Sequence, residues 1–511
     1  MQGRKRRDLI VWLAYIIVLA FTIPWHEPWN DEAQAWLLAR DLSLSQLIFH
    51  ALRYESHPPL WYLILWIPAH LHIGYFIFSW ISGAIAAAGI YVLLRLSPFP
   101  FYLRAILPFS FYLAYQYSVV ARSYVLFPLL CFLVAHAYRQ EKPRPVLLTI
   151  YLALLANVSI HGTMVACLVA AIYGWNHFRP GHTDNIARRG LIPASIIFGA
   201  SLALVALIIF PAPRDLATVT SPAVTRVLVG FQPEIAIPAW VRALPPPPPA
   251  PPYVPIEQGG VRGRLASLPR RISYSISSSY LIAFALYLLV IAFLYTRGQL
   301  LLLLPLATII LFLGIVYGRS WHLGLIWITL LMILWAAWDP NADISPGLNL
   351  QKVLSAFLFL ICLLQLSWTW RAIRYDIRSP YSGAKAAAEY LHTLPANLRI
   401  AAFEPESTAI LPYFSRNIFF NQPTTFWLWS TRNTIDIDTP QTIATHPDLI
   451  IVLQQHTREN GVDDNPILDY AQLNGYRETH HFCGSIFMHE FQKAPDSCYL
   501  ILQPTAAPSI R

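Results

Sequence analysis

The sequence contains little charge. Only 12% of its 511 residues are charged, whereas 56% are hydrophobic, and the chain has 17 Trp and 26 Tyr. A soluble protein of this length cannot bury so much apolar surface, but helices that face lipid need not bury theirs. The composition therefore excludes an ordinary soluble globular protein and predicts a mainly α-helical, polytopic membrane protein.

Several short motifs are also missing. The chain has no glycine-rich phosphate-binding loop and no internal repeat, and none of its five cysteines has the spacing of a zinc or iron–sulfur site. Three cysteines lie in apolar runs, whereas Cys483 and Cys498 lie in the polar C-terminal region. If that region is extracytoplasmic, these two can form a disulfide, because oxidising conditions persist there.

The net charge of +9 invites comparison with nucleic-acid-binding proteins. The basic residues, however, occur in short clusters between apolar runs, so membrane topology explains them and no nucleic-acid partner is expected. The cluster at residues 4–7 precedes the first apolar run, and no small-residue cleavage site follows. We therefore expect an uncleaved anchor with a cytoplasmic N-terminus.

Apolar runs of about 17 to 25 residues predict about eleven membrane spans. They cover residues 9–24, 74–94, 103–120, 122–138, 146–160, 162–178, 190–210, 273–296, 299–317, 321–338 and 351–370. The basic loops fall on the cytoplasmic side only if residues 25–95 contain one crossing. Pro68 interrupts the run at 60–73, so we expect this run to lie in the membrane interface as a shallow helix.

The predicted organisation has two parts. Residues 1–370 form a transmembrane module with a first outer loop at 25–73 and a long proline-rich outer loop at 211–272. From about Arg371 the composition becomes soluble, and helical segments alternate with short apolar strands, which predicts a small α/β domain at 371–511. An odd number of crossings puts this domain outside the cytoplasm, and the bacterial inner membrane is the simplest location.

This topology gathers the ionisable residues that lie close to the spans on the outer side of the membrane. They are Asp31, Glu32, Glu55, His57, Arg122, His161, Arg319 and His322. A chance scatter would divide them between the two sides. Charged groups beside a span are costly, so such a cluster is a functional-site hypothesis.

Asp31 and Glu32 are the candidate catalytic residues. Both begin a helix at residues 31–42, where a carboxylate can cap the N-terminus and complement the helix dipole. Adjacent carboxylates on a first turn point in different directions. We therefore expect one to cap the helix and the other to face a cavity, and we favour Asp31 for the second role.

Transfer of a sugar needs a base for the acceptor hydroxyl and a group that stabilises the leaving phosphate. Asp31 is the predicted base. The cationic or hydrogen-bonding groups that can bind substrate or lipid phosphate are Glu55, His57, Arg122, His161, Arg319 and His322. The alternative for the two later histidines is a structural role, and Arg319 can simply flank its span.

Residues 54–62, with the sequence YESHPPLWY, form the most specific local motif. The tandem prolines fix a kink directly after Glu55 and His57 and hold both side chains at the membrane surface. A simple turn into a helix explains the prolines equally well. Glu55 with a histidine also has oxygen and nitrogen ligands for a divalent metal, so a metal site stays open, but no motif requires a cofactor.

These residues resemble the GT-C superfamily of lipid-phosphosugar-dependent glycosyltransferases, in particular the protein O-mannosyltransferases and the lipid A aminoarabinose transferase. Three segments carry the resemblance: Asp31-Glu32, Glu55 with residues 57–60 (HPPL), and residues 121–124 (ARSY). The aminoarabinose branch has Glu-Lys before the two prolines, where this chain has Glu-Ser-His. That branch also has an acidic residue in its second outer loop, where this chain has Arg-Ser-Tyr.

The resemblance implies a polyprenyl-phosphate sugar donor that enters from the bilayer, and inversion at the anomeric carbon. It makes Asp31 the catalytic base and places His57 against the lipid phosphate. It gives Glu55 a metal role only in the aminoarabinose branch. The implied acceptor is a glycan, a lipid or a protein, bound beneath the long loop and the C-terminal domain.

Two other functions remain open at this point. A lipid-linked oligosaccharide ligase or polymerase fits the topology, but would depend on arginines and a histidine and not on a loop aspartate. A flippase or transporter of lipid-linked sugars would place charges near the middle of the bilayer, usually within repeated halves.

Overall fold

The computed structural model describes residues 2–55, 57–140, 142–178, 185–210, 213, 268–269, 271–277, 279–316, 320–344, 349–429, 439–457, 461–462, 465–487 and 496–505. Arg319 and almost all of the predicted long outer loop at 211–272 lie outside these ranges, so the predictions made for them stay predictions.

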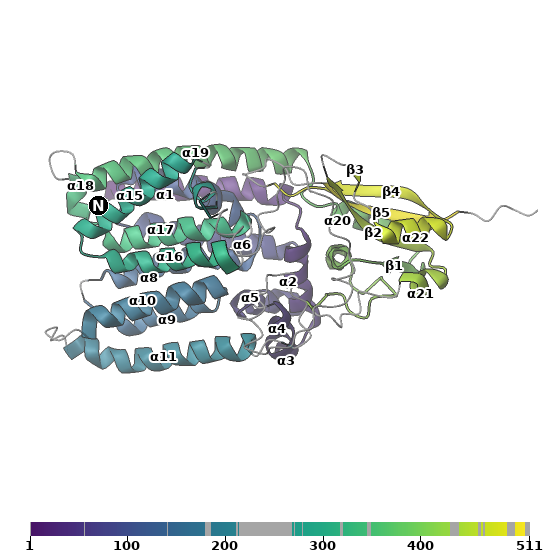
Figure 1. Ribbon diagram of the computed structural model, residues 1–511, viewed down its shortest axis with the longest axis horizontal. Coiled ribbons are helices and arrows are strands. Elements are labelled where there is room, and N and C mark those ends of the chain that lie inside the picture. The colour runs from purple at the N-terminus through teal and green to yellow at the C-terminus, as the bar shows by residue number, and fades with distance from the viewer. Residues whose placement is uncertain are drawn as a thin grey trace, which may run out of the picture.

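Long helices run side by side along the long axis of the molecule, with the N-terminus at one end and the C-terminal sheet at the other (Figure 1). The main helices are α1 (Gln2–Thr22), α6 (Ile77–Leu96), α8 (Leu126–Tyr138), α9 (Pro145–Ala156), α10 (Ile160–Phe178), α11 (Asn185–Ile209), α15 (Tyr280–Thr296), α16 (Leu303–Leu311), α17 (Leu323–Ala337) and α19 (Leu350–Arg378). A short helix, α18 (Pro340–Ile344), precedes α19.

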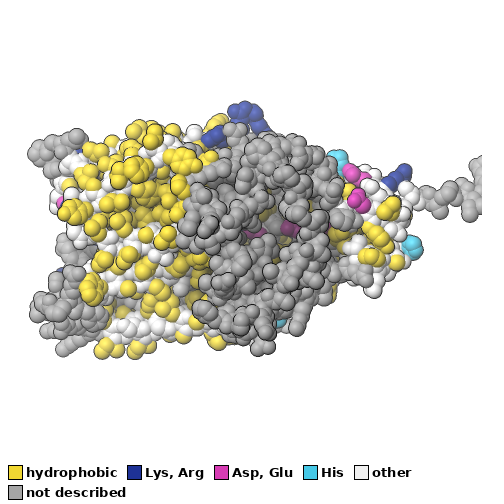
Figure 2. Space-filling view, viewed as in Figure 1, with side chains coloured by type: hydrophobic (Ala, Val, Ile, Leu, Met, Phe, Trp, Pro, Cys, Tyr) yellow, Lys and Arg dark blue, Asp and Glu magenta, His cyan; other side chains and the backbone are white. Residues whose placement is uncertain are grey.

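Five stretches of the described chain are long and apolar enough to cross a membrane. They are Gly3–Trp25, Ile77–Leu96, Gly190–Ile209, Ser320–Ala337 and Leu350–Arg378. Hydrophobic side chains dominate the visible face of the bundle, whereas charged side chains appear mainly toward the C-terminal region (Figure 2). The fold is that of the predicted helical membrane protein with a small C-terminal α/β region.

The predicted span at 103–120 is not one regular helix. It contains α7 (Phe101–Ile106), a 3₁₀ turn at Leu107–Phe109 and a π-helical turn at Tyr112–Gln116. Pro108 has no backbone N–H, so a regular α-helical ladder cannot continue through it. The segment ends in extended backbone at Arg122, with φ −120° and ψ 168°.

The first outer loop folds into α2 (Asn30–Asp41), α3 (Leu44–Gln46), a π-helical turn (Leu47–Ala51), α4 (Leu52–Glu55) and α5 (Leu60–His70). Helix α2 runs across the ends of the long helices (Figure 1). Helix α5 has 11 residues. It is therefore about 16 Å long, too short to cross a hydrocarbon core of about 30 Å.

The C-terminal region is the predicted mixture of helices and strands. Its elements are α20 (Ala384–His392), β1 (Ile400–Ala402), a 3₁₀ helix η9 (Pro405–Tyr413), α21 (Thr439–Ala444), β2 (Leu449–Thr457), β3 (Gly461–Val462), α22 (Pro466–Leu473), β4 (Tyr476–Gly484) and β5 (Asp496–Pro504). The sheet order is β1-β2-β5-β4, with β3 paired to β2. Only β1 and β2 are parallel among these pairs. Cys483 and Cys498 face each other across β4 and β5 and form a disulfide, as the sequence allowed.

The C-terminal region packs directly on the first outer loop. The Gln34 side-chain amide donates a hydrogen bond to the Trp427 carbonyl at 2.5 Å. The Lys385 backbone N–H donates to the Glu27 carboxylate at 2.8 Å. These bonds join α2 and the segment before it to the C-terminal region.

Candidate active site

Asp31 and Arg122 form an ion pair at the N-terminus of α2. The Arg122 Nη2 atom lies 2.8 Å from Asp31 Oδ2, and the two side chains are 16% and 26% exposed. The break in the predicted span at 103–120 delivers Arg122 to this position in extended backbone. A carboxylate and a guanidinium from distant parts of the chain therefore meet at a partly accessible point, where a ligand can reach both.

Aromatic rings surround the Arg122 guanidinium group. Its Cζ atom lies 5.6 Å from the ring centroid of Trp29 and 5.4 Å from those of Tyr124 and Trp321. Contacts of this length are favourable cation–π interactions that hold the charged group in place. They hold the guanidinium group at the edge of the site.

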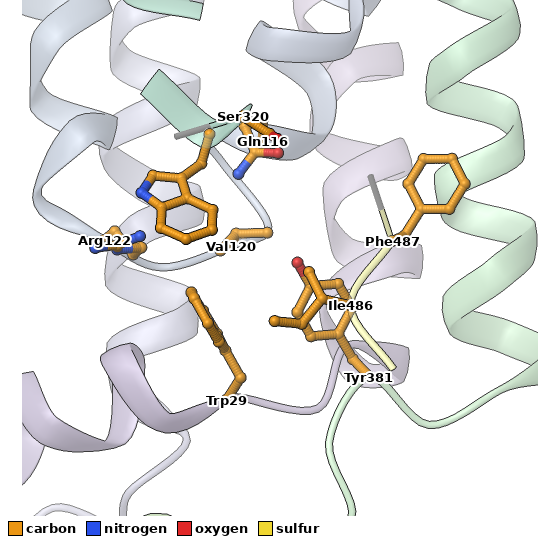
Figure 3. A pocket seen from close by; sticks show the side chains of 9 residues that line it. Trp29, Gln116, Val120, Arg122, Ser320, Tyr381, Ile486 and Phe487 are labelled. Atoms are coloured by element: carbon orange, nitrogen blue, oxygen red, sulfur yellow. The ribbon is translucent and has the colours of Figure 1, made fainter. Parts of the chain in front are cut away.

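A small pocket opens beside Arg122 (Figure 3). Its lining residues are Trp29, Gln116, Val120, Arg122, Ser320, Trp321, Tyr381, Ile486 and Phe487. Tyr381, Ile486 and Phe487 follow the last long helix in the chain, whereas the others belong to the helical part. The pocket therefore lies between the bundle and the C-terminal region.

Two buried histidines lie next to this pair. The rings of His161 and His322 have centroids 5.2 Å apart, and the Tyr124 hydroxyl lies 2.8 Å from His322 Nε2. Neither ring nitrogen of His161 has a hydrogen-bond partner among the described residues, although the residue is only 3% exposed. Buried polar atoms without partners are uncommon, so His161 has unused capacity for a ligand oxygen.

Glu55 and His57 also belong to this site, within electrostatic range of Asp31 and Arg122. The Glu55 carboxylate accepts a hydrogen bond from Gln34 Nε2 at 3.0 Å, and His57 Nδ1 donates to the Glu55 carbonyl at 2.6 Å. The pKa of Glu55 is raised to about 7, mainly by burial and in part by Asp31, while Gln34 and Arg122 oppose the shift. Burial lowers the pKa of His57, which favours its neutral form.

Glu32 occupies a different environment from its neighbour. It is fully buried, its Oε1 accepts from the Ala121 backbone N–H at 2.6 Å, and its Oε2 accepts from the Trp29 N–H at 3.2 Å. Glu32 therefore caps α2, as expected for one of the two adjacent carboxylates. Asp31 faces Arg122 instead, and the catalytic role predicted for Glu32 remains a prediction.

The structure thus brings seven of the predicted site residues to one end of the bundle: Asp31, Glu32, Glu55, His57, Arg122, His161 and His322. Sequence reasoning missed the aromatic surroundings of Arg122 and the buried Asp376. Asp376 could have been noticed in the sequence because it is an acidic residue near the end of an apolar helix.

A metal ion bound by these side chains needs several oxygen or nitrogen ligands in one place. Among the described residues, no group of three His, Cys, Asp or Glu side chains is arranged to hold one. Glu55, the candidate ligand, bonds to the Gln34 amide. The described side chains therefore do not fit a metal site, and no step of the chemistry below uses a metal.

Comparison with known proteins gives structural likenesses only. No protein-family model and no curated protein matches this chain. The chain is similar to the crystal structure of ArnT from Cupriavidus metallidurans in the apo state, with a TM-score of 0.49 and 11% identity, covering 96% of this chain and 97% of that one. It is also similar to the cryo-EM structure of the arabinofuranosyltransferase AftD from Mycobacteria, with a TM-score of 0.40 and 14% identity, covering 98% of this chain and 40% of that one.

Proposed function

We propose that this chain is a membrane glycosyltransferase that moves a sugar from a polyprenyl-phosphate donor to an acceptor hydroxyl on the extracytoplasmic side. The observation that supports this most is the Asp31–Arg122 pair, which sets a carboxylate and a guanidinium 2.8 Å apart beside a pocket. Transfer from a lipid phosphate needs one group of each kind. The lipid enters between apolar helices, and the acceptor is a glycan, a lipid or a protein.

In the proposed reaction, the Asp31 carboxylate accepts the proton of the acceptor hydroxyl as its oxygen attacks the anomeric carbon. The bond between that carbon and the phosphate oxygen breaks, and polyprenyl phosphate leaves with the bonding electrons. Attack opposite the leaving group inverts the anomeric configuration. Atoms and charge balance because the proton moves to Asp31 and the negative charge moves to the phosphate.

Arg122 has two partners in this proposal. Without donor it bonds to Asp31, and with donor it turns to the phosphate, where a charge-assisted hydrogen bond stabilises the developing charge. This exchange releases the Asp31 carboxylate for the acceptor. In this proposal His57, His161 and His322 supply further hydrogen bonds to phosphate or sugar oxygens.

The test is transfer of radiolabelled sugar by the purified full-length chain in nanodiscs, with polyprenyl-phosphate hexoses and pentoses as donors and an extract of the source membranes as acceptor pool. We expect Asp31→Asn to lower kcat by a hundredfold or more while donor binding is retained, because general bases contribute about 10²- to 10⁴-fold. Asp469→Asn, at an exposed position on α22, is the matched control. Near-normal transfer by Asp31→Asn would remove Asp31 from the chemistry.

A further inference from the structure

A buried network of polar groups connects α19 with the first outer loop. His26 Nε2 lies 3.2 Å from Glu32 Oε2, and His26 Nδ1 lies 3.1 Å from Asp376 Oδ2. The Tyr115 hydroxyl donates to both Asp376 oxygens at 2.9 Å. Glu32, His26 and Asp376 are 0%, 4% and 5% exposed, respectively. Three segments that are remote in sequence, around residues 26–32, 115 and 376, meet in this network.

The network continues into the site through Glu32. Its Oε1 accepts from the Ala121 N–H at 2.6 Å, and Ala121 directly precedes Arg122. Its Oε2 accepts from the Trp29 N–H, and Trp29 contacts the Arg122 guanidinium. Glu32 also follows Asp31 in the chain. One carboxylate therefore holds the backbone on both sides of the Asp31–Arg122 pair.

The charge of His26 makes this arrangement possible. Two buried carboxylates repel each other and lose their solvation, unless a cation lies between them. Burial alone would lower the pKa of His26, but Glu32 and Asp376 outweigh that cost and raise it to about 10. The imidazolium form donates one hydrogen bond to each carboxylate and so anchors Glu32 to α19.

We propose that His26 is a positioning residue, which sets the geometry of the Asp31–Arg122 pair by tying Glu32 to Asp376. The catalytic part of this proposal rests on the proposed glycosyl transfer. The structural part does not, because it concerns how Ala121 and α2 are held. His26 touches no reacting atom. Its ring packs against the ring of Tyr381, which lines the pocket, with centroids 4.6 Å apart, and its hydrogen bond to Glu32 links it to the Asp31–Arg122 pair.

The experiment separates positioning from simple charge balance. In the full chain in nanodiscs, His26→Gln leaves two buried carboxylates without a cation, and we expect a lower Tm together with a kcat at least tenfold lower and KM changed less than threefold. Adding Asp376→Asn restores the net charge of the network and should recover most of the Tm. It should not recover kcat, because Glu32 still lacks its link to α19. His50→Gln, at an exposed histidine in the same loop, is the control.

Two results would overturn the proposal: a His26→Gln variant whose kcat stays within twofold of wild type, or a double variant whose kcat recovers along with its Tm. Amide hydrogen exchange gives a readout that does not need transfer. His26→Gln should speed exchange at Ala121, whose N–H is bound to Glu32, but not at Ile451 in β2. If wild type transfers no sugar, the proposed function fails, and unchanged exchange at Ala121 would separately refute the positioning role.

Discussion

Neighbouring residues in this site have opposite environments. Asp31 is partly exposed and faces a guanidinium, whereas Glu32 is fully buried and bonds to two backbone N–H groups and a histidine. Adjacent positions on a helix point about 100° apart, so one turn can supply both a reactive group and the group that fixes its position. Asp31, the proposed catalytic base, is the carboxylate of the two that solvent can reach.

Glu55 provides a prediction about pH. Burial raises its pKa to about 7, above the ordinary value of 4.5, so the folded chain binds more protons than the unfolded chain between these two values. Stability contributed by this group therefore falls as pH rises through that window. We expect the Tm of wild type to fall more between about pH 5 and about pH 8 than that of Glu55→Gln, which cannot titrate.

The measurement is thermal unfolding of both proteins in the same detergent across that range. Glu478→Gln, which removes a more exposed carboxylate on β4, should track wild type. Parallel Tm curves for wild type and Glu55→Gln would mean that Glu55 is not protonated in the folded chain near neutral pH.

Some of the residues that form the candidate site could be predicted from the sequence. Loop charge places the ionisable residues on one side of the membrane, which is why Asp31, Arg122 and the histidines can be grouped from the sequence alone. The hydrogen-bond partners of the buried groups could not be predicted, because His26 and Asp376 are separated by 350 positions and no local pattern links them. The aromatic rings that surround Arg122 could not be predicted either, because aromatic residues are common throughout the chain.

At the scale of elements, hydropathy located the long helices well but not their irregularities. The run at 103–120 is apolar enough to predict a span, yet Pro108 and a π-helical turn break it. Hydropathy measures transfer into lipid and is insensitive to backbone hydrogen bonding. The break matters for function because it leaves Arg122 in extended backbone at the edge of the site.

The β4–β5 pair offers a test at the same scale. The Cys483–Cys498 disulfide closes a loop with a sequence separation of 15 residues. A loop of this size is expected to stabilise the fold by about 3 kcal/mol, through its effect on the unfolded chain. We expect the double variant Cys483→Ser, Cys498→Ser to lower the free energy of unfolding of the C-terminal region by about that amount.

Denaturant unfolding followed by tryptophan fluorescence checks this value. Reducing agent should destabilise wild type to the level of the double variant and leave the variant unchanged. Equal stability of oxidised wild type and the variant would show that the cross-link contributes nothing to the C-terminal fold.

For the whole molecule, the position of the site follows from how two parts of the chain meet. The pocket has walls from the helical part and from the C-terminal region (Figure 3). Gln34 on α2 bonds to both Glu55 and Trp427. The N-terminus lies at the opposite end of the bundle (Figure 1). The predicted topology, in which the N-terminus is cytoplasmic and the site is extracytoplasmic, stays a prediction.

That topology can be measured with a membrane-impermeant maleimide. Lys5→Cys and Gln472→Cys place a thiol at an exposed position at each end of the molecule. In intact membrane vesicles of right-side-out orientation, we expect Gln472→Cys to be labelled and Lys5→Cys to react only after lysis. The reverse pattern would put the site on the cytoplasmic face and contradict the assignment of the basic loops.

The most direct test of the central claim follows the donor itself. Wild type in liposomes receives polyprenyl-phosphate sugars labelled with ¹³C at the anomeric carbon, together with the acceptor extract, and NMR records the labelled carbon. The account predicts that one donor releases free polyprenyl phosphate in step with the appearance of a new glycosidic carbon of opposite configuration. Donors that stay intact while crossing between leaflets, or a product that retains configuration, would contradict it.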